Sequence, residues 1–424
     1  MQFKEYPSYK ASGVEWLGDV PEHWNLKRFG YLFDENKKKN IGLKETNVLS
    51  LSYGNIKEKN IDDNKGLLPE SFETYQIIEP NDIIFRFTDL QNDKRSLRSA
   101  ISKYHGIITS AYIGVKTKQN ADFYNYLFRA YDLQKVFYSM GEGMRQSLKM
   151  DELNKMPVVL PSKDEQKYIV SFLDTETTRI DNLISKQEKL IELLEEQRKS
   201  IISHAVTKGL NPNAPMKDSG VEWLGEVPED WEVKRFGYIF TENKKKNIGL
   251  IETNVLSLSY GNIKEKNIDD NKGLLPESFE TYQIIEPNDI VFRFTDLQND
   301  KRSLRNAISK YHGIITSAYI GVKTKENADF YNYLFRAYDL QKVFYSMGDG
   351  MRQSLKMDEL NKMPIVLPKI EAQERIVKFI NEENQRINNL VVKQKNLIEK
   401  LKEYRSSIIS HAVTGKIDVR EFGA

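Results

Sequence analysis

The sequence contains an internal repeat, and the second copy follows the first at a constant distance of 207 residues. The stretch from Gly13 to Gly18 returns as Gly220 to Gly225, and the stretch from Ser203 to Thr207 returns as Ser410 to Thr414, with no insertion or deletion between these anchors. Such a unit is far longer than the repeat of a solenoid, which is roughly 20–50 residues. The sequence therefore predicts a duplicated domain with a connector, and whatever one copy binds the other should bind too.

The similarity between the copies is uneven. Across positions 45–161 the copies differ at five positions, which are Ile84/Val291, Ser99/Asn306, Gln119/Glu326, Glu142/Asp349 and Val158/Ile365. Across 162–207 only 25 of 46 positions match. We therefore expect two nearly identical globular units, each large enough for its own core and each followed by a more diverged connector.

Composition excludes several classes of protein. The 424 residues carry 63 Lys and Arg against 61 Asp and Glu, so the net charge of +2 does not by itself indicate a nucleic-acid-binding protein. The absence of cysteine excludes disulfides, thiolate metal sites and cysteine nucleophiles. No run approaches the ~18 apolar residues that span a membrane, and the N-terminus has no apolar signal core. We expect a cytoplasmic protein.

Each globular copy has the pattern of a mixed α+β domain. Short apolar runs broken by Gly, Asn and Asp predict strands at 48–53, 82–87, 111–115 and 156–161. Apolar residues spaced by three and four predict a helix over 121–139 that stops at the glycines following it. The tyrosines of this helix, Tyr124, Tyr126 and Tyr131, are expected to pack inside the domain rather than to stack on bases.

The connectors have the pattern of long helices. From Asp164 to Ala205 there is neither Pro nor Gly, and a seam of mostly apolar residues runs at alternating steps of four and three, which predicts a helix of roughly 60 Å in a coiled coil. The apolar seam residues are Leu173, Ile180, Ile184, Ile191, Leu194 and Ile201 in the first copy, and Ile380, Ile387, Val391, Ile398, Leu401 and Ile408 in the second. Gln187 and Gln394 fall at matching seam positions, where each is either a tolerated polar residue or a device that fixes the register. A Pro- and Asn-rich linker at 208–215 separates the copies, and antiparallel helices would relate the two units by a pseudo-twofold axis.

Three motifs occur twice and in the same order. They are Ser-Gly-Val-Glu-Trp-Leu-Gly-x-Val-Pro-Glu-x-Trp at 12–24 and 219–231, Leu-Lys-Met-Asp-Glu-Leu-Asn-Lys-Met-Pro at 148–157 and 355–364, and Arg-x-Ser-Ile-Ile-Ser-His-Ala-Val-Thr at 198–207 and 405–414. The second is followed both times by Leu-Pro-x-x-x-x-Gln, at 160–166 and 367–373. With these motifs the chain resembles, over nearly its whole length, the specificity (S) subunit of type I restriction-modification systems.

The resemblance implies an architecture and a set of partners. It implies two target-recognition domains, each reading one half of a split DNA site, and an antiparallel coiled coil that docks two methyltransferase (M) subunits, through which restriction (R) subunits join. S-adenosylmethionine, ATP and Mg²⁺ would act on the partner subunits, and none would be bound by this chain. The implied boundaries are a recognition domain at 1–162, a connector helix at 163–207, a linker at 208–218, a second recognition domain at 219–368, a second connector helix at 369–414 and a tail at 415–424. The departure from the family pattern is how alike the two recognition domains are.

Motifs for catalysis are absent from the sequence. The Asp/Asn-Pro-Pro-Tyr/Phe motif of adenine methyltransferases does not occur, and the one Asn-Pro lies in the linker at Asn211. There is no G-x-x-x-x-G-K-[S/T] loop for a nucleotide-driven motor. His105 and His204 have no partners at metal-ligand spacing. We therefore expect a non-catalytic subunit without a metal site.

The strongest candidate for DNA recognition lies between positions 86 and 105, where basic residues exceed acidic ones by three. Arg can read guanine, Asn and Gln can read adenine, and Lys mostly neutralises phosphate. The alternative is a solvated hairpin with balanced charge. The candidates in this segment are Arg86, Gln91, Asn92, Lys94, Arg95, Arg98 and Lys103, and in the second copy Arg293, Gln298, Asn299, Lys301, Arg302, Arg305 and Lys310.

Three smaller groups are further DNA-binding candidates. A lysine cluster suits phosphate but is equally compatible with a solvated surface, a Tyr-Gly-Asn sequence could approach a base edge or simply close a hairpin, and an Arg-Gln pair could contact DNA or pair within the domain. In the first copy these are Lys37, Lys38, Lys39, Tyr53, Asn55, Arg145 and Gln146, and in the second Lys244, Lys245, Lys246, Tyr260, Asn262, Arg352 and Gln353.

The sequence thus predicts a DNA-recognition subunit that directs methyltransferase and restriction subunits to a bipartite site. Because the recognition domains are nearly identical, the site should be an inverted repeat with a nonspecific gap, and Ser99/Asn306 is the position expected to cause any one-base asymmetry. One alternative is a free-standing DNA-binding regulator that uses the same duplicated domains. Another is a coiled-coil spacer without a DNA role, which leaves the Arg-rich segments unexplained.

Overall fold

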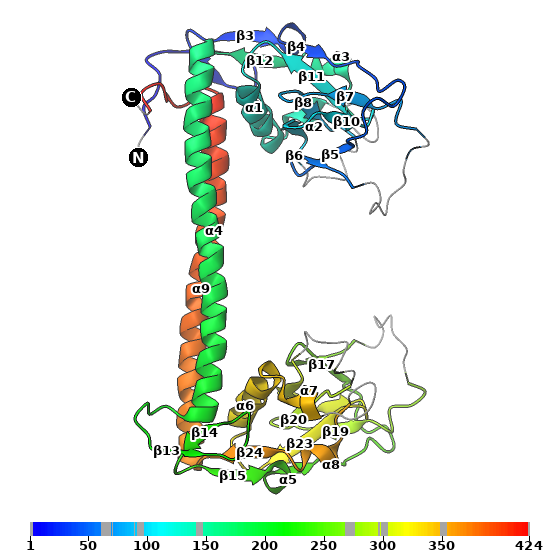
Figure 1. Ribbon diagram of the computed structural model, residues 1–424, viewed down its shortest axis with the longest axis vertical. Coiled ribbons are helices and arrows are strands. Elements are labelled where there is room, and N and C mark those ends of the chain that lie inside the picture. The colour runs from blue at the N-terminus through cyan, green and yellow to red at the C-terminus, as the bar shows by residue number, and fades with distance from the viewer. Residues whose placement is uncertain are drawn as a thin grey trace. The chain divides into compact units, whose positions relative to one another are not determined.

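The computed structural model describes residues 3–60, 69, 71–88, 90, 97–140, 147–267, 276–295, 297, 304–347 and 354–422. The chain divides into two compact units (Figure 1). The first unit comprises Met1–Gln187 and Lys395–Ala424, and the second comprises Glu188–Gln394. Each unit therefore contains one globular domain together with a segment of each of the two long helices.

The centre of the first unit is a four-stranded antiparallel sheet. Its strand order is β4 (Phe33–Glu35), β11 (Ile113–Thr117), β8 (Ile83–Phe85) and β9 (Ser99–Ile101). All three residues of β8 are buried, so the sheet is covered on both faces. Ile83 and Phe85 pack into an aromatic core with helix α1 (Ala121–Leu133), whereas Ile84, which points the opposite way, packs against a second apolar layer.

The second apolar layer is formed by short strand pairs. The hairpin of β5 (Leu49–Ser52) and β6 (Asn55–Glu58) and the antiparallel pair of β7 (Gln76–Ile78) and β10 (Gly106–Ile108) supply the apolar side chains that meet Ile84. Two further pairs among the described residues are β1 (Tyr9–Ala11) with β2 (Asp19–Pro21) and β3 (Asn25–Arg28) with β12 (Pro157–Leu160). The mixed helix-and-strand domain predicted from the sequence is confirmed.

The helix predicted over 121–139 is divided in two. Asn120 caps α1 by accepting a hydrogen bond from the Phe123 amide at 3.1 Å. The chain breaks at Lys135, whose φ of 62° is left-handed, before α2 (Val136–Met140) begins. Tyr124 and Tyr131 are buried and Tyr126 is partly buried, as expected for packing residues. The remaining short helices of this domain are η1 (Phe29–Tyr31) and α3 (Met150–Leu153).

The second unit repeats these elements in the same order. Its strands are β13 (Met216–Asp218), β14 (Glu226–Pro228), β15 (Glu232–Arg235), β16 (Phe240–Glu242), β17 (Leu256–Ser259), β18 (Asn262–Glu265), β19 (Gln283–Ile285), β20 (Ile290–Phe292), β21 (Asn306–Ile308), β22 (Gly313–Ile315), β23 (Ile320–Thr324) and β24 (Pro364–Leu367). Its short helices are α5 (Phe236–Ile239), α6 (Ala328–Leu340), α7 (Val343–Met347) and α8 (Met357–Leu360).

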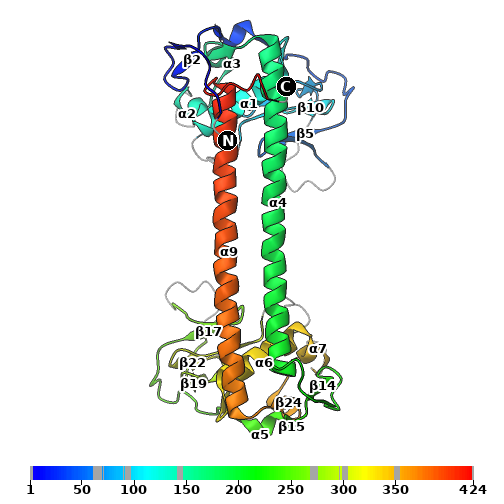
Figure 2. The same cartoon turned by 90° about the vertical axis from the view of Figure 1, so that its left-hand side faces the viewer.

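The long helices are α4 (Lys163–Lys208) and α9 (Ile370–Val413), close to the bounds that the sequence predicts. Figure 2 shows a segment of α4 beside a segment of α9 within each unit. In the first unit Arg405 donates to Asp181 at 2.9 Å, and in the second Arg198 donates to Asn388 at 2.6 Å. These are the same two positions of the repeat, so both units join their helix segments by an equivalent cross-helix contact. Among the described residues, no helix is long and apolar enough to cross a membrane.

The expected seam residues are all buried or partly buried. Leu173, Ile180 and Ile408 belong to the same core as the first domain, so that end of the helix pair is continuous with the domain interior. Leu194, Ile387 and Val391 instead form a cluster in which every member comes from α4 or α9. Gln187 and Gln394 are partly buried.

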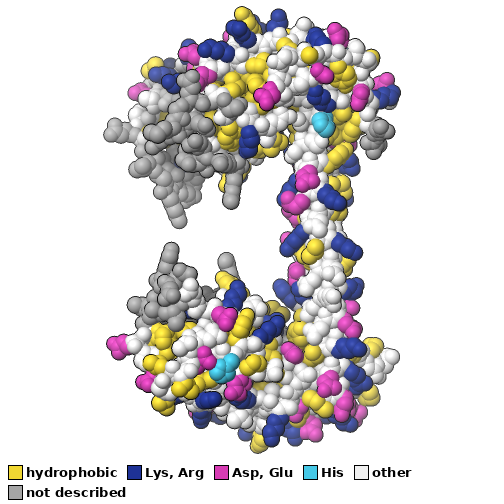
Figure 3. Space-filling model, turned by 180° about the vertical axis from the view of Figure 1, so that it is seen from behind, with side chains coloured by type: hydrophobic (Ala, Val, Ile, Leu, Met, Phe, Trp, Pro, Cys, Tyr) yellow, Lys and Arg dark blue, Asp and Glu magenta, His cyan; other side chains and the backbone are white. Residues whose placement is uncertain are grey.

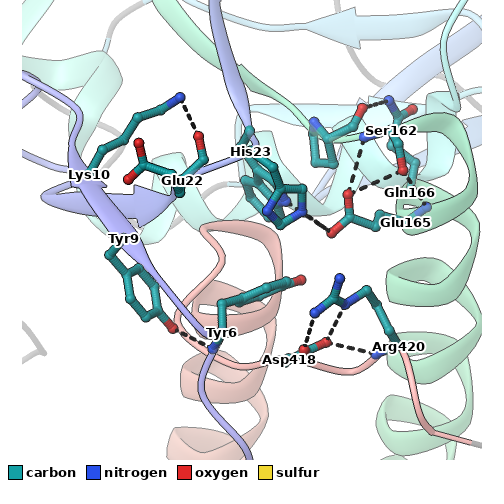
Figure 4. Close-up of polar contacts among 12 residues, drawn as sticks. Tyr6, Tyr9, Lys10, Glu22, His23, Ser162, Glu165, Gln166, Asp418 and Arg420 are labelled. Carbon is teal, nitrogen blue, oxygen red and sulfur yellow. Dashed lines mark hydrogen bonds and ion pairs between the residues drawn. The ribbon is translucent and has the colours of Figure 1, made fainter.

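The two ends of the chain meet in the first unit. Lys4 forms an antiparallel bridge with Asp418, and its Nζ lies 2.6 Å from a Glu421 carboxylate oxygen. Figure 4 shows the adjoining contact, in which a Glu165 oxygen lies 2.8 Å from His23 Nε2. Trp24 Nε1 donates to the same oxygen at 3.1 Å. Burial raises the pKa of Glu165, but the hydrogen bonds from His23 and Trp24 outweigh burial and hold that pKa below its ordinary value.

In the second unit the corresponding positions are Asp230 and Ala372, which cannot form this contact. A cavity of about 340 Å³ lies there, lined by Trp231, Ala372 and the linker residues from Lys208 to Asn211. At this place the first unit packs residues from both ends of the chain, and the second packs the linker.

Candidate nucleic-acid interface

The β5–β6 hairpin presents two of the predicted residues at its tip. The turn between the strands consists of Tyr53 and Gly54, whose φ angles of 47° and 72° are both positive, as in a type I′ turn. The Tyr53 residue is 70% exposed, and the Asn55 side-chain amide donates to the Tyr53 carbonyl oxygen at 3.2 Å. The second unit repeats this turn at Tyr260, Gly261 and Asn262.

A cavity adjoins each hairpin. In the first unit it measures about 460 Å³ and lies between β6, β9 and α1, with Asn55, Lys57 and Lys103 in its lining. The equivalent cavity of the second unit measures about 620 Å³ and includes Asn262, Lys264 and Lys310. The structure thus brings together Asn55 and Lys103, which are distant in sequence. These amide and ammonium groups are donors suited to base edges and phosphates.

Several residues of the cavity were not among the sequence candidates. Lys57 lies two residues after Asn55 on the same strand, so strand periodicity could have placed both on one face. Tyr104, Asn125 and Arg129 also line the cavity, but no short-range signal connects them with the hairpin. The acidic lining differs between the units, because Asp174 of the first is replaced by Asn381 in the second.

The lysine cluster lies on a different part of the domain surface. Lys37, Lys38 and Lys39 are exposed, but the segment is held in place because the Ile77 amide donates to the Lys38 carbonyl oxygen at 2.8 Å. Lys37 lies 3.3 Å from Glu35, and Lys38 lies 3.7 Å from Glu79. In the second unit Lys244 and Lys245 pair in the same way, and Lys246 is exposed. Such exposed ion pairs are weak and leave the ammonium groups open to phosphate.

The prediction that Arg98 and Arg305 read DNA is wrong. Both are fully buried, at 0% exposure. The Arg98 Nη1 donates to the Thr88 carbonyl oxygen at 3.2 Å, and the guanidinium carbon lies 5.7 Å from the centre of the Tyr138 ring. Arg98 precedes β9 and turns inward toward α2, a direction that a count of basic residues does not reveal. Arg86, which follows β8, the strand paired with β9, is partly exposed. Arg293 of the second unit is partly exposed as well.

Ser99 and Asn306, the position expected to cause any one-base asymmetry, are both buried in the sheet. The Asn306 side-chain amide donates to the Asn332 carbonyl oxygen at 3.0 Å and to the Asn332 side-chain oxygen at 2.9 Å. In the first unit Ser99 Oγ and Asn125 Oδ1 are buried without a hydrogen-bond partner among the described residues. The position therefore alters packing between β9 and α1 rather than base recognition.

We expect Ser99→Asn to stabilise the first unit by about 1 kcal/mol, because the new amide can satisfy Asn125 as Asn306 satisfies Asn332. The reverse change, Asn306→Ser, should destabilise the second unit by a similar amount. Thermal unfolding of the full chain measures both, and the methylated-base pattern serves as the control because neither variant should change it. A changed pattern would show that this position influences recognition.

The other sequence candidates lie outside the described residues. In the first copy they are Gln91, Asn92, Lys94, Arg95, Arg145 and Gln146, and in the second Gln298, Asn299, Lys301, Arg302, Arg352 and Gln353. Leu97 follows the first of these segments and packs directly on the hairpin tip, since a β-carbon on Gly54 would lie 2.8 Å from Leu97 Cδ1.

Charge and potential metal ligands are dispersed over the described surface. On the face in Figure 3, basic and acidic side chains are interspersed rather than gathered by sign. His105 lies 3.0 Å from Glu45, and His312 lies 2.6 Å from Glu252. Within the described ranges, no group of three or more His, Asp or Glu residues could hold a metal ion.

Comparisons with known proteins agree on one family. Residues 21–194 match the type I restriction modification DNA specificity domain. A putative type I restriction enzyme MjaX specificity subunit of Methanocaldococcus jannaschii is 24% identical, with 99% of each chain covered, and the MjaVIII specificity subunit of the same organism is also 24% identical, with 99% of this chain and 98% of that one covered.

Solved structures show the same fold. A chain from a study of complex assembly and conformational transition of the type I R-M system has a TM-score of 0.62 at 14% identity and covers 93% of this chain and 98% of its own. The HsdS subunit from Thermoanaerobacter tengcongensis has a TM-score of 0.54 at 14% identity, with 94% and 98% covered. Because residues 228–401 repeat the matched segment in register, both halves of this chain share the likeness.

Proposed function

We propose, from its similarity to type I restriction-modification specificity subunits, that this chain is such a subunit and selects the DNA site at which the complex acts. As a specificity subunit the chain has a recognition role and not a catalytic one. The observation that carries the proposal is that the segment matched at 21–194 is repeated in register at 228–401, with residues 45–161 nearly unchanged. Each copy would then read one half of a bipartite site.

The proposed interface consists of the exposed polar and basic side chains around each hairpin and its cavity. In the first unit these are Tyr53, Asn55, Lys57 and Lys103. The partly exposed Arg86, which follows β8, stays a separate candidate. The lysine cluster at 37–39 would hold the DNA backbone, because Lys acts on phosphate mainly as a point charge. The residues of 91–96 and 145–146 stay candidates for base reading.

The proposed partners carry the chemistry. Two methyltransferase subunits would dock on the long helices and methylate adenine with S-adenosylmethionine, and restriction subunits would join through them and use ATP and Mg²⁺. The complex would act on cytoplasmic DNA. Co-purification of the full chain with a methyltransferase subunit separates this proposal from a free-standing DNA-binding regulator, which would bind DNA alone and retain no such partner.

We expect the recognised site to be an inverted repeat with a nonspecific gap. The domains differ at only five positions across 45–161, and three of these, Ile84/Val291, Ser99/Asn306 and Val158/Ile365, are buried, so the two copies should read the same bases. The antiparallel connector helices expected from the sequence would give the two half-sites opposite orientations. Mapping methylated adenines in a host that carries the whole system tests this directly.

The modified adenines should fall at mirror positions in identical half-sites. The same host without this chain is the control and should lack these modifications. Two unrelated half-sites would contradict both the palindrome and the assignment of specificity to residues 45–161. An intact DNA complex with no sequence preference would contradict the proposed function itself.

A further inference from the structure

We propose that Tyr53 and Tyr260 insert their rings into the base stack of the two half-sites, and that Arg129 and Arg336 position them. This inference rests on the proposed DNA-binding function and adds a mode of contact to it. The argument depends on the backbone of the turn, its anchor and its surroundings.

The backbone of the turn is unfavourable for a tyrosine. The first central position of a type I′ turn has a positive φ, and Asn, Asp or Gly normally occupies it because a bulkier side chain is strained there. Tyr53 has φ 47° and Tyr260 has φ 48°. No gain in packing compensates, since the two residues are 70% and 68% exposed. Folding therefore does not account for an aromatic residue here, whereas a ligand that takes up the ring does.

An arginine side chain of α1 or α6 holds the backbone of each turn. Arg129 of α1 donates from Nη2 to the Gly54 carbonyl oxygen at 2.6 Å, and Arg336 of α6 makes the same bond to Gly261 at 2.6 Å. Burial lowers the pKa of Arg129 and of Arg336. Both arginines are partly buried, and their Nε atoms have no hydrogen-bond partner among the described residues, so the bond to the turn carbonyl oxygen is the contact that holds each guanidinium.

Gly54 is packed tightly against its neighbours. A β-carbon there would lie 2.9 Å from Arg129 Nη2 and 2.8 Å from Leu97 Cδ1. The tip is thus clamped between α1 and the residue that precedes Arg98, with the tyrosine directed away from the domain. A rigid aromatic side chain on a fixed support loses little conformational freedom when it binds.

The surroundings of the tip favour DNA over a protein surface. Asn55 and Lys57 follow the tyrosine on β6, and Lys103 lines the same cavity. A ring flanked by amide and ammonium donors matches nucleic acid, in which stacked bases lie beside phosphates. Proteins that insert an apolar or aromatic wedge partly unstack a base step and kink the duplex.

The test uses the full chain assembled with its methyltransferase partners and duplexes carrying the mapped site. Each adenine of a half-site is replaced in turn by 2-aminopurine, whose fluorescence rises when the base loses its stacking neighbours. Besides the target adenine, which the methyltransferase itself takes out of the stack, we expect the wild-type complex to raise the fluorescence at one further step in each half-site. Tyr53→Asn together with Tyr260→Asn should abolish this rise and weaken specific binding on the order of 5- to 100-fold per half-site.

Asparagine suits the left-handed turn, so these variants should melt at the wild-type temperature or above it, which separates a binding defect from a folding defect. Tyr53→Phe with Tyr260→Phe should keep the signal because the ring is retained. Tyr31→Asn with Tyr238→Asn, which alters two other exposed tyrosines, is the matched control and should change nothing.

The positioning role has its own readout. Arg129→Met with Arg336→Met should lose the fluorescence rise although both tyrosines are present, and Arg129→Lys with Arg336→Lys should restore part of it by donating to the Gly54 and Gly261 carbonyl oxygens. Unchanged fluorescence and affinity in the Tyr→Asn variants would overturn the inference while leaving site recognition by the wild type intact. A loss of partner capture in those variants would assign the tip to a protein contact instead and would also overturn it.

Discussion

Replacement of Arg98 by methionine is expected to destabilise the first unit by about 3 kcal/mol and to leave the recognised bases unchanged. The guanidinium is fully buried, donates to the Thr88 carbonyl oxygen and lies against the Tyr138 ring. Methionine restores part of the volume but leaves that oxygen without its donor and removes the positive charge near Asp132. Calorimetry of the full chain measures the stability, and methylated-base mapping measures the recognition.

The defect of Arg98→Met should shrink as the pH is lowered. Burial raises the pKa of Asp132, and the Arg98 amide and the nearby positive charges oppose that rise. Removing one of these charges raises the pKa of Asp132 further, so the variant is penalised most where the carboxyl is ionised, at neutral pH. Below the ordinary pKa of an aspartate, the carboxyl is protonated in both folded proteins, and this part of the defect is lost.

Lys103→Met is the matched control for Arg98→Met. Lys103 belongs to the same basic segment but is exposed and lines the cavity beside the hairpin. Lys103→Met should weaken DNA binding and leave the unfolding temperature unchanged. This is the opposite of what we expect for Arg98→Met. An Arg98 variant that unfolds at the wild-type temperature but directs methylation to altered sites would show that this arginine reads DNA.

The contrast between these two residues shows what the sequence could predict of the interface. The sequence located the basic segment, because charge and side-chain type are local properties. It could not separate buried Arg98 from exposed Lys103, since that distinction depends on how β9 pairs with β8 and how α1 and α2 cover the sheet. For the same reason the cavity shared by Asn55 and Lys103 appears only once the hairpin is packed on β9.

The fold was more accessible to prediction, because its strongest signals are periodic. The absence of Pro and Gly placed the first long helix at 164–205, within three residues of the observed ends at Lys163 and Lys208. The break between α1 and α2 was missed, since Lys135 adopts a left-handed conformation that its residue type does not announce. The contact of Glu165 with His23 and Trp24 was missed as well, because it joins elements more than a hundred residues apart.

Two neighbouring valines of α9 provide a second test with a large expected effect. Val391 is 7% exposed and packs with Leu194 and Ile387, whereas Val392 is 54% exposed. Val391→Asp places a carboxylate in a cluster made only of helix side chains, which should cost about 3 kcal/mol and separate the helix segments of the second unit. Val392→Asp makes the same chemical change one residue later and should alter the unfolding temperature little.

The two variants also distinguish the inner and outer surfaces of the helices in assembly. If the methyltransferase subunits dock on the paired helices, Val391→Asp should lose them in co-purification, because the pair that forms their surface no longer holds together. The domain core of the second unit uses other residues of these helices, among them Val377 and Ile380, so the domain should stay folded and bind a half-site weakly. Full retention of the methyltransferase by Val391→Asp, with the helix segments shown to be apart by hydrogen exchange, would place the docking surface on the globular domains. Loss of the partner in Val392→Asp, at unchanged stability, would instead place the exposed edge of α9 in the interface.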